Sequence, residues 1–167
     1  LLLYDAGSVD EIFRQAGFDL HPRLFMEYNF EAAAANAAGL EPALPENIEI
    51  CGWSPEHYQH AAELIHEAYT GHIDAFINDQ YCSLHGSLRF LHNIVRFPGC
   101  GVFDAANSWV LRETRTGELV GVVLCSRVAE DVAHITQLCI AKNRRGHRMG
   151  KTLLKHCMEH LAQSGFK

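Results

Sequence analysis

The sequence predicts a mixed α/β domain, with helices packed on a mixed sheet, and two patterns support this fold class. Residues 132–161 alternate like a strand, pass through a basic turn with two glycines, and continue with helical periodicity. Before them, residues 48–127 contain a short strand pattern, two helical patterns and a hairpin pattern. The 167 residues are enough for one domain with a buried core.

The first 47 residues predict an extension ahead of this domain. Residues 8–11, Ser-Val-Asp-Glu, form a capping box that opens a short helix ending near Gly17. Residues 23–28 predict a strand with two faces, one of Leu24, Met26 and Tyr28 and the other of Arg23, Phe25 and Glu27. Residues 31–47 begin with an alanine-rich turn or two of helix and continue with prolines, so they are predicted to be a linker.

Residues 48–96 predict one strand followed by two helices. The strand covers residues 48–51, and Ser54-Pro55-Glu56 then starts a helix with a cap residue, a first-turn proline and an acid. Gly71 ends this first helix. The apolar faces of the two helices are Ala61, Leu64, Ile65 and Ala68 in the first, and Leu88, Leu91, Ile94 and Val95 in the second.

A hairpin precedes the strand–turn–helix pattern. Residues 108–113 and 119–127 are its two strands, and the turn between them is Thr-Arg-Thr-Gly. In the helix that begins near Met149, apolar residues recur at steps of three and four, which predicts a buried stripe of Met149, Leu153, Leu154, Cys157 and Leu161.

The turn before this helix predicts an anion site. Gly146 and Gly150 allow a ligand to approach the backbone, and the first amides of a helix have no partner within the helix. Six of the fourteen Lys and Arg residues lie between Lys142 and Lys155, with no acid among them, although the chain carries a net charge of −6. A local positive charge at a helix N-terminus indicates a binding site for phosphate.

Residues 145–150, Arg-Gly-His-Arg-Met-Gly, resemble the (Q/R)-x-x-G-x-(G/A) loop of the GNAT superfamily, the acyl-CoA-dependent N-acetyltransferases. The order of predicted elements extends the resemblance over about residues 48–167. The chain departs from the loop pattern at Arg148, where the family prefers glycine. An arginine there either narrows the pyrophosphate pocket or adds a charge to it.

The resemblance implies a GNAT-like fold that lacks its C-terminal third, because the family continues with a strand, a helix and two more strands. Residues 48–167 are then an incomplete acetyltransferase domain, and residues 1–30 resemble the tail of a preceding repeat in a tandem protein. Two alternatives stay open. Residues 1–30 complete the sheet of this chain or of a homodimer partner, or they are an unrelated extension.

The resemblance also implies the site and its co-substrate, acetyl-CoA. The backbone N–H of Leu138 faces the thioester carbonyl, and Cys139 and Ile140 continue along the pantetheine arm. His134 corresponds to a general base, with a histidine held in the sheet as the alternative. The general acid is often a tyrosine in a helix that lies beyond Lys167. The pyrophosphate is expected on Arg145, Gly146, His147, Arg148, Met149, Gly150, Lys151 and Thr152.

The amine acceptor, a small molecule or a protein, is expected in the loop between the first two helices, where a purely solvated loop is the alternative. Its candidate residues are Tyr69, His72, Asp74, Asp79 and Tyr81. No metal site is expected, because His156 and His160 are four residues apart on a helix without a third ligand.

Composition narrows the class of protein further. The overall acidity argues against nucleic-acid binding, and no apolar run approaches the roughly 20 residues that span a bilayer. The six cysteines contain no C-x-x-C pair, and Cys125, Cys139 and Cys157 fall in apolar patterns. We therefore expect a cytoplasmic protein without disulfides.

Two other functions compete with catalysis. A CoA-binding or structural repeat without activity fits the same pattern, with Arg148 as a mark of decay. Residues 146–152 also approach the G-x-x-x-x-G-K-(S/T) loop of nucleotide-binding proteins, but they have three residues between the glycines where that loop has four. The reaction that the resemblance implies, acetyl transfer by direct attack of an amine on the thioester, is the function we expect.

Overall fold

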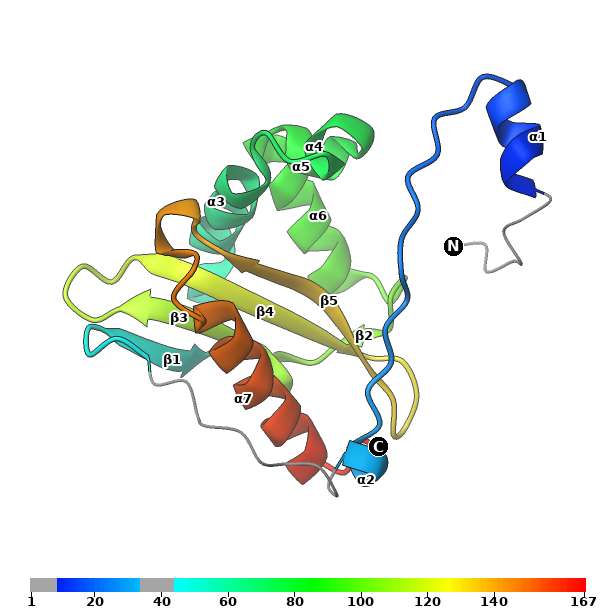
Figure 1. Ribbon diagram of the computed structural model, residues 1–167. Coiled ribbons are helices and arrows are strands. Elements are labelled where there is room, and N and C mark those ends of the chain that lie inside the picture. The colour runs from blue at the N-terminus through cyan, green and yellow to red at the C-terminus, as the bar shows by residue number, and fades with distance from the viewer. Residues whose placement is uncertain (1–8, 34–43) are drawn as a thin grey trace.

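The computed structural model describes residues 9–33 and 44–167, and the latter form a sheet covered by helices on both faces (Figure 1). The strands are β1 Ile48–Gly52, β2 Val102–Phe103, β3 Trp109–Glu113, β4 Leu119–Arg127 and β5 Ala133–Ile140. The helices of this part are α3 Tyr58–Tyr69, α4 Asp74–Ile77, α5 Asp79–Cys82, α6 Leu84–Arg96 and α7 Met149–Gln163, with short 3₁₀ turns at Pro55–His57, Ala105–Asn107 and Lys142–Arg144. The predicted combination of helices and sheet is confirmed.

Strand β4 is the centre of the sheet. On one side it pairs with β3 and, near its end, with β2; on the other side it pairs with β5, and all these pairings are antiparallel. Strand β1 extends the sheet beyond β3. Every residue of β4 from Leu119 to Ser126 is buried, because helices cover both faces. The predicted hairpin corresponds to β3 and β4.

The start of the first helix follows from its sequence. Ser54 accepts a hydrogen bond from the N–H of Glu56, and the N–H of Ser54 donates to Nδ1 of His57 at 3.1 Å, which completes a capping box. Pro55 occupies the first turn, where a missing N–H costs nothing. The chain therefore enters α3 at the predicted place, through one 3₁₀ turn.

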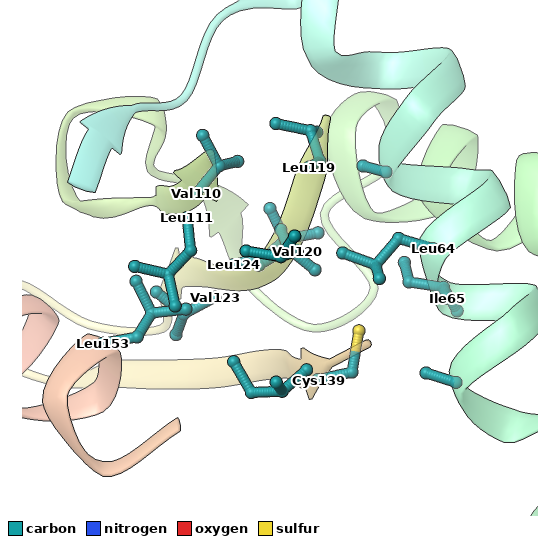
Figure 2. Packing of buried hydrophobic residues seen from close by; sticks show 14 of the residues in the cluster. Leu64, Ile65, Val110, Leu111, Leu119, Val120, Val123, Leu124, Cys139 and Leu153 are labelled. Atoms are coloured by element: carbon teal, nitrogen blue, oxygen red, sulfur yellow. The ribbon is translucent and has the colours of Figure 1, made fainter. Parts of the chain in front are cut away.

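The core has two layers, one on each face of the sheet (Figure 2). Leu64 and Ile65 of α3 lie on one face, and Leu153 of α7 lies beside Leu111 and Val123 on the other. The predicted stripe of α7 is confirmed at its four buried members, whereas Leu154 is half-buried. The four are Met149, Leu153, Cys157 and Leu161.

The N-terminal extension agrees with the prediction only in part. Helix α1, Val9–Gln15, forms where the capping box predicts it, although Ser8 itself lies outside the described residues. Helix α2, Phe30–Ala33, is the first turn of the alanine-rich segment, and residues 34–43 of the linker lie outside the description.

The predicted strand over residues 23–28 is wrong. These residues form no strand, and Leu24 and Met26 are 91% and 87% exposed. Alternation predicts a strand only where a neighbouring strand supplies hydrogen bonds and a surface to bury one face against. No strand of the described residues pairs with this segment.

Strand β5 is an edge of the sheet, and this feature positions the site. It pairs with β4 along one side, and among the described residues no strand pairs with its other side. An edge strand presents unpaired N–H and C=O groups to whatever lies beside it.

The described residues also contain no helix that is long and apolar enough to cross a membrane.

Candidate active site

A cavity of about 530 Å³ lies where the end of β5 meets the start of α7. Eight of its lining residues are among those predicted to bind the co-substrate: Leu138, Cys139, Ile140, Arg145, Gly146, Arg148, Met149 and Gly150. The other four lining residues are Ala68, Tyr69, His72 and Arg144. The structure therefore brings the strand and the loop of the predicted site to one cavity, while His147, Lys151 and Thr152 lie outside its lining.

The edge of β5 turns two backbone amides away from the sheet. Ala141 donates its N–H to the carbonyl of Val120 at 2.9 Å, so it faces β4. Residues of an antiparallel strand alternate between facing their neighbour and facing away. The pairing is regular from Gln137 to Ile140, so the N–H groups of Leu138 and Ile140 point to the open edge. The carbonyl of Ile140 points the same way, because it accepts a hydrogen bond from Arg145.

The start of α7 adds a second set of amides. Thr152 makes the first helical hydrogen bond, donating its N–H to the carbonyl of Arg148 at 3.0 Å. The amides of residues 149–151 come before that bond and have no carbonyl within the helix to donate to. They lie at the positive end of a fifteen-residue helix. The sequence predicts an anion site at these amides.

Arg148 adopts a left-handed backbone conformation, with φ of 60° and ψ of 4°. It is the one non-glycine residue with positive φ among the described residues. A side chain with a Cβ is strained in this region, which glycine enters freely. The glycine that the loop pattern prefers at this position therefore has a physical reason. Arg148 adopts the same left-handed conformation at a cost in backbone strain.

The cations around the turn divide into two groups. Arg145 donates from Nε to the carbonyl of Ile140 at 3.1 Å and from Nη2 to the carbonyl of Ala68 at 2.8 Å. Arg144 pairs with Glu113 at 3.3 Å, and Lys142 donates to the carbonyl of Thr70. These three therefore hold the loop to β3 and α3.

Arg148 and Lys151 belong to the second group. Both are exposed, and neither side chain has a partner within the described part of the chain. Part of the predicted positive charge is therefore used to hold the loop, and these two cations remain exposed beside the start of α7.

His134 and His72 lie in different places. His134 is exposed near the start of β5, opposite Ser126, and does not line the cavity. His72 does line it. The N–H of Asp74 donates to Nδ1 of His72 at 3.2 Å, and a carboxylate oxygen of Asp74 lies 3.3 Å from the same atom. Asp74 can thus hold His72 in either tautomer.

Three polar side chains gather at the wall of the cavity, and one of them, Tyr69, lines it. The rings of Tyr69 and Tyr81 stack, with centroids 4.0 Å apart, and both phenols lie 3.5 Å from the amide of Gln137 on β5. Gln137 is buried, with 4% of its surface exposed. Burial raises the pKa of both phenols, so they stay protonated at neutral pH. The sequence pointed to the two tyrosines, but their contact with Gln137 depends on the fold.

The two acids of the predicted acceptor loop are already paired. Asp74 forms an ion pair with Arg23 from the N-terminal segment, and Asp79 forms one with Arg89. Both carboxylates therefore already have a cationic partner.

Cys139 lies in the cavity wall but is 7% exposed. Burial raises the pKa of this thiol to about 12. A thiol reacts as a nucleophile only when it is ionised, so Cys139 is an unreactive member of the wall.

No group of three or more His, Cys, Asp or Glu side chains within the described ranges could hold a metal ion. His156 and His160 pack their rings on Trp109, with centroids 4.3 and 4.4 Å away. The two histidines are thus part of the packing between α7 and β3.

Replacing Arg148 tests the strained turn. Arg148→Gly should relieve about 1–2 kcal/mol of left-handed strain, of which the greater freedom of glycine in the unfolded chain takes back about 0.4–1 kcal/mol. We expect a small net gain in the free energy of unfolding, measured by chemical denaturation. Arg148→Ala is the matched control, because it removes the same charge and keeps the Cβ; an equal gain in both variants would contradict the strain argument.

Comparison with solved structures finds the same fold in acetyltransferases. A GCN5-related N-acetyltransferase from Sphaerobacter thermophilus superposes with a TM-score of 0.58 at 16% identity, over 79% of this chain and 37% of that chain. The chain thus spans little more than a third of that protein. A PaiA N-acetyltransferase from Thermoplasma acidophilum in complex with coenzyme A gives 0.48 at 20% identity, over 71% and 74% of the two chains. A GNAT family acetyltransferase from Brucella melitensis in complex with acetyl-CoA gives 0.49 at 15% identity, over 71% of each.

Sequence comparison assigns the family. No curated protein matches the chain. The sequence profile of the acetyltransferase (GNAT) family matches residues 78–167, which is more than half of the chain and includes β5, the loop and α7. The fold and the sequence agree, and this chain belongs to the acetyltransferase (GNAT) family.

Proposed function

We propose that this chain is an N-acetyltransferase that transfers the acetyl group of acetyl-CoA to an amine by direct attack on the thioester. One observation supports this above all. The outward amides of Leu138 and Ile140 share a cavity with the free amides at the start of α7. A ligand that fills both needs an extended amide-bearing arm and an anionic end, and acetyl-CoA has both.

The two halves of the cavity suit the two halves of coenzyme A. The pantetheine arm carries amide groups that can pair with the edge of β5 as another strand does. The diphosphate suits the amides of residues 149–151, with Arg148 and Lys151 beside them. In this arrangement the N–H of Leu138 meets the thioester carbonyl and stabilises the negative charge that forms there in the transition state.

Direct attack fits the cavity better than an acyl-enzyme route. Cys139 is the cysteine in the lining, and its raised pKa keeps it a thiol. An acylated cysteine intermediate needs a thiolate. The amine therefore attacks the thioester carbon itself, and the site accelerates the reaction by holding the two reactants together.

A general base must accept a proton from the amine, and two histidines compete for this role. The family resemblance points to His134, whereas the cavity contains His72. When Nδ1 of His72 carries a proton toward Asp74, Nε2 is left as a proton acceptor. We favour His72 as the base because of this position.

The proposed acceptor is an amine, and two ion pairs bear on the charge it carries. Asp74 and Asp79 are paired with arginines, so they do not favour a polycation as the acceptor.

The six cysteines are all free, which fits a reducing cytoplasm. Residues 48–167 hold the sheet and the cavity and are the proposed catalytic unit. Residues 1–30 keep the proposed role as part of a neighbouring repeat or a partner's sheet.

Titration and turnover test the proposed function together. Isothermal titration calorimetry of the chain with acetyl-CoA should give a saturable heat, and ATP–Mg should give none. Release of free thiol from acetyl-CoA should then depend on an added primary amine. Binding without thiol release for any amine in a panel of small amines and lysine peptides would favour the inert repeat. No acetyl-CoA binding at all would contradict the proposal.

Paired histidine variants test the base. His72→Gln should lower kcat/KM about 100-fold at neutral pH, because a positioned base contributes at least that factor. His134→Gln is the matched control, because His134 is also exposed but lies outside the cavity, and its kcat/KM should stay within about threefold of the wild type. Both values are measured by thiol release. A larger loss of kcat/KM in His134→Gln than in His72→Gln would identify His134 as the general base instead.

A further inference from the structure

His72 contacts Asp74 in two ways that require opposite tautomers of its neutral ring. The backbone N–H of Asp74 donates to Nδ1 of His72 at 3.2 Å, and this bond needs an unprotonated Nδ1, with the proton on Nε2. A carboxylate oxygen of Asp74 lies 3.3 Å from the same Nδ1, and this contact needs the proton on Nδ1. The second arrangement is the one that leaves Nε2 free to accept a proton.

The two contacts differ in how firmly they are held. The backbone is fixed here, since the N–H of His72 donates to the carbonyl of Tyr69 at 2.8 Å and its carbonyl accepts from the N–H of Ala75 at 3.0 Å. The N–H of Asp74 therefore stays beside Nδ1. The carboxylate can leave, because a side chain turns among three staggered positions about χ1. A group that keeps the carboxylate in place thus favours the tautomer that can act as a base.

Arg23 is the group that holds this carboxylate. It lies in the extended segment that joins α1 to α2 (Figure 1), 51 residues before Asp74 in the chain, and pairs with the carboxylate oxygen that His72 does not contact. Its Nη1 donates to the carbonyl of Pro22 at 3.2 Å, which orients the guanidinium. Phe30, at the start of α2, packs against the core and anchors the same segment.

We propose that Arg23 is a positioning residue for the reaction. By holding the carboxylate of Asp74 against Nδ1, it keeps His72 in the tautomer that accepts the proton of the amine. The inference rests on the proposed function, since His72 is the proposed base. Arg23 itself does not line the cavity. The N-terminal segment therefore contributes to catalysis from outside the proposed catalytic unit.

Arg23 has two opposing effects on the contact between Asp74 and His72. Its charge weakens the attraction of the carboxylate for a proton on Nδ1, while the ion pair restricts the carboxylate to one position. The side chains of Arg23 and Asp74 are 52% and 25% exposed, and water and salt screen exposed charges. The effect on position is therefore the larger one. Its size is about threefold, because the side chain has three staggered positions and an exposed ion pair is weak.

The tautomer of His72 is measured by the nitrogen-15 shifts of its ring, in the full chain at a pH of about 8.5, where an ordinary imidazole is neutral. The spectrum of His72→Gln assigns its resonances among those of the eleven histidines. We expect the ratio of the Nδ1–H form to the Nε2–H form to fall about threefold in Arg23→Ala. Arg89→Ala is the matched control, because it breaks the other ion pair of this loop, with Asp79, and keeps the pair that holds Asp74.

Turnover should follow the tautomer. We expect kcat to fall about threefold in Arg23→Ala, with acetyl-CoA affinity unchanged by calorimetry, while Arg89→Ala turns over like the wild type. In the background of Asp74→Asn, Arg23→Ala should cause no further loss, because the carboxylate that Arg23 holds is gone. A merely structural role of Arg23 would not depend on the residue at position 74.

An equal or larger proportion of the Nδ1–H form in Arg23→Ala would overturn the inference. A loss of kcat that persists in the Asp74→Asn background would overturn it as well. Both results would leave the proposed function standing. Failure of the wild-type chain to bind acetyl-CoA is a different result, because it removes the proposed function and this inference with it.

Discussion

The open edge of β5 is the constraint on which the rest of the site depends. Backbone amides that leave a sheet unpaired need a partner, whether water, another strand or a ligand. Here the amides of Leu138 and Ile140 are left unpaired by β4, and the first turn of α7 leaves three more amides unpaired a short distance away. Leu138 and Ile140 of the strand, and Met149 and Gly150 of the helix, line one cavity. The protein thus presents unsatisfied backbone groups in a row, and a ligand can satisfy them in turn.

The surrounding side chains keep this row in place. Arg145 ties the end of β5 to the end of α3 through two backbone carbonyls, and Gly150 lets α7 approach Ile140 so closely that a Cβ would lie 3.3 Å from it. The buried stripe of α7 fixes the helix on the sheet below the turn. Stability and function are therefore linked, because the contacts that hold α7 to the sheet also aim its N-terminus at the cavity.

The sequence predicted the features that depend on local patterns. The strand–turn–helix of residues 132–161, the hairpin and the cap at Ser54 follow from periodicity and turn chemistry. The strand at residues 23–28 failed because alternation needs a pairing partner, and β2 was missed because two residues carry no period. The tying role of Arg145 and the cluster of Tyr69, Tyr81 and Gln137 join segments 56 to 77 residues apart. Spacing along the chain cannot predict such contacts.

The central claim is that the edge of β5 and the start of α7 grip one ligand by their backbone. The most direct measurement is a titration of isotope-labelled protein with acetyl-CoA, followed by the amide resonances in NMR spectra. The account predicts large shifts at Leu138, Ile140 and residues 149–151, with the amides of β1, which lies at the far edge of the sheet, unchanged. Saturable binding that leaves the amides of Leu138 and Ile140 unshifted would contradict it.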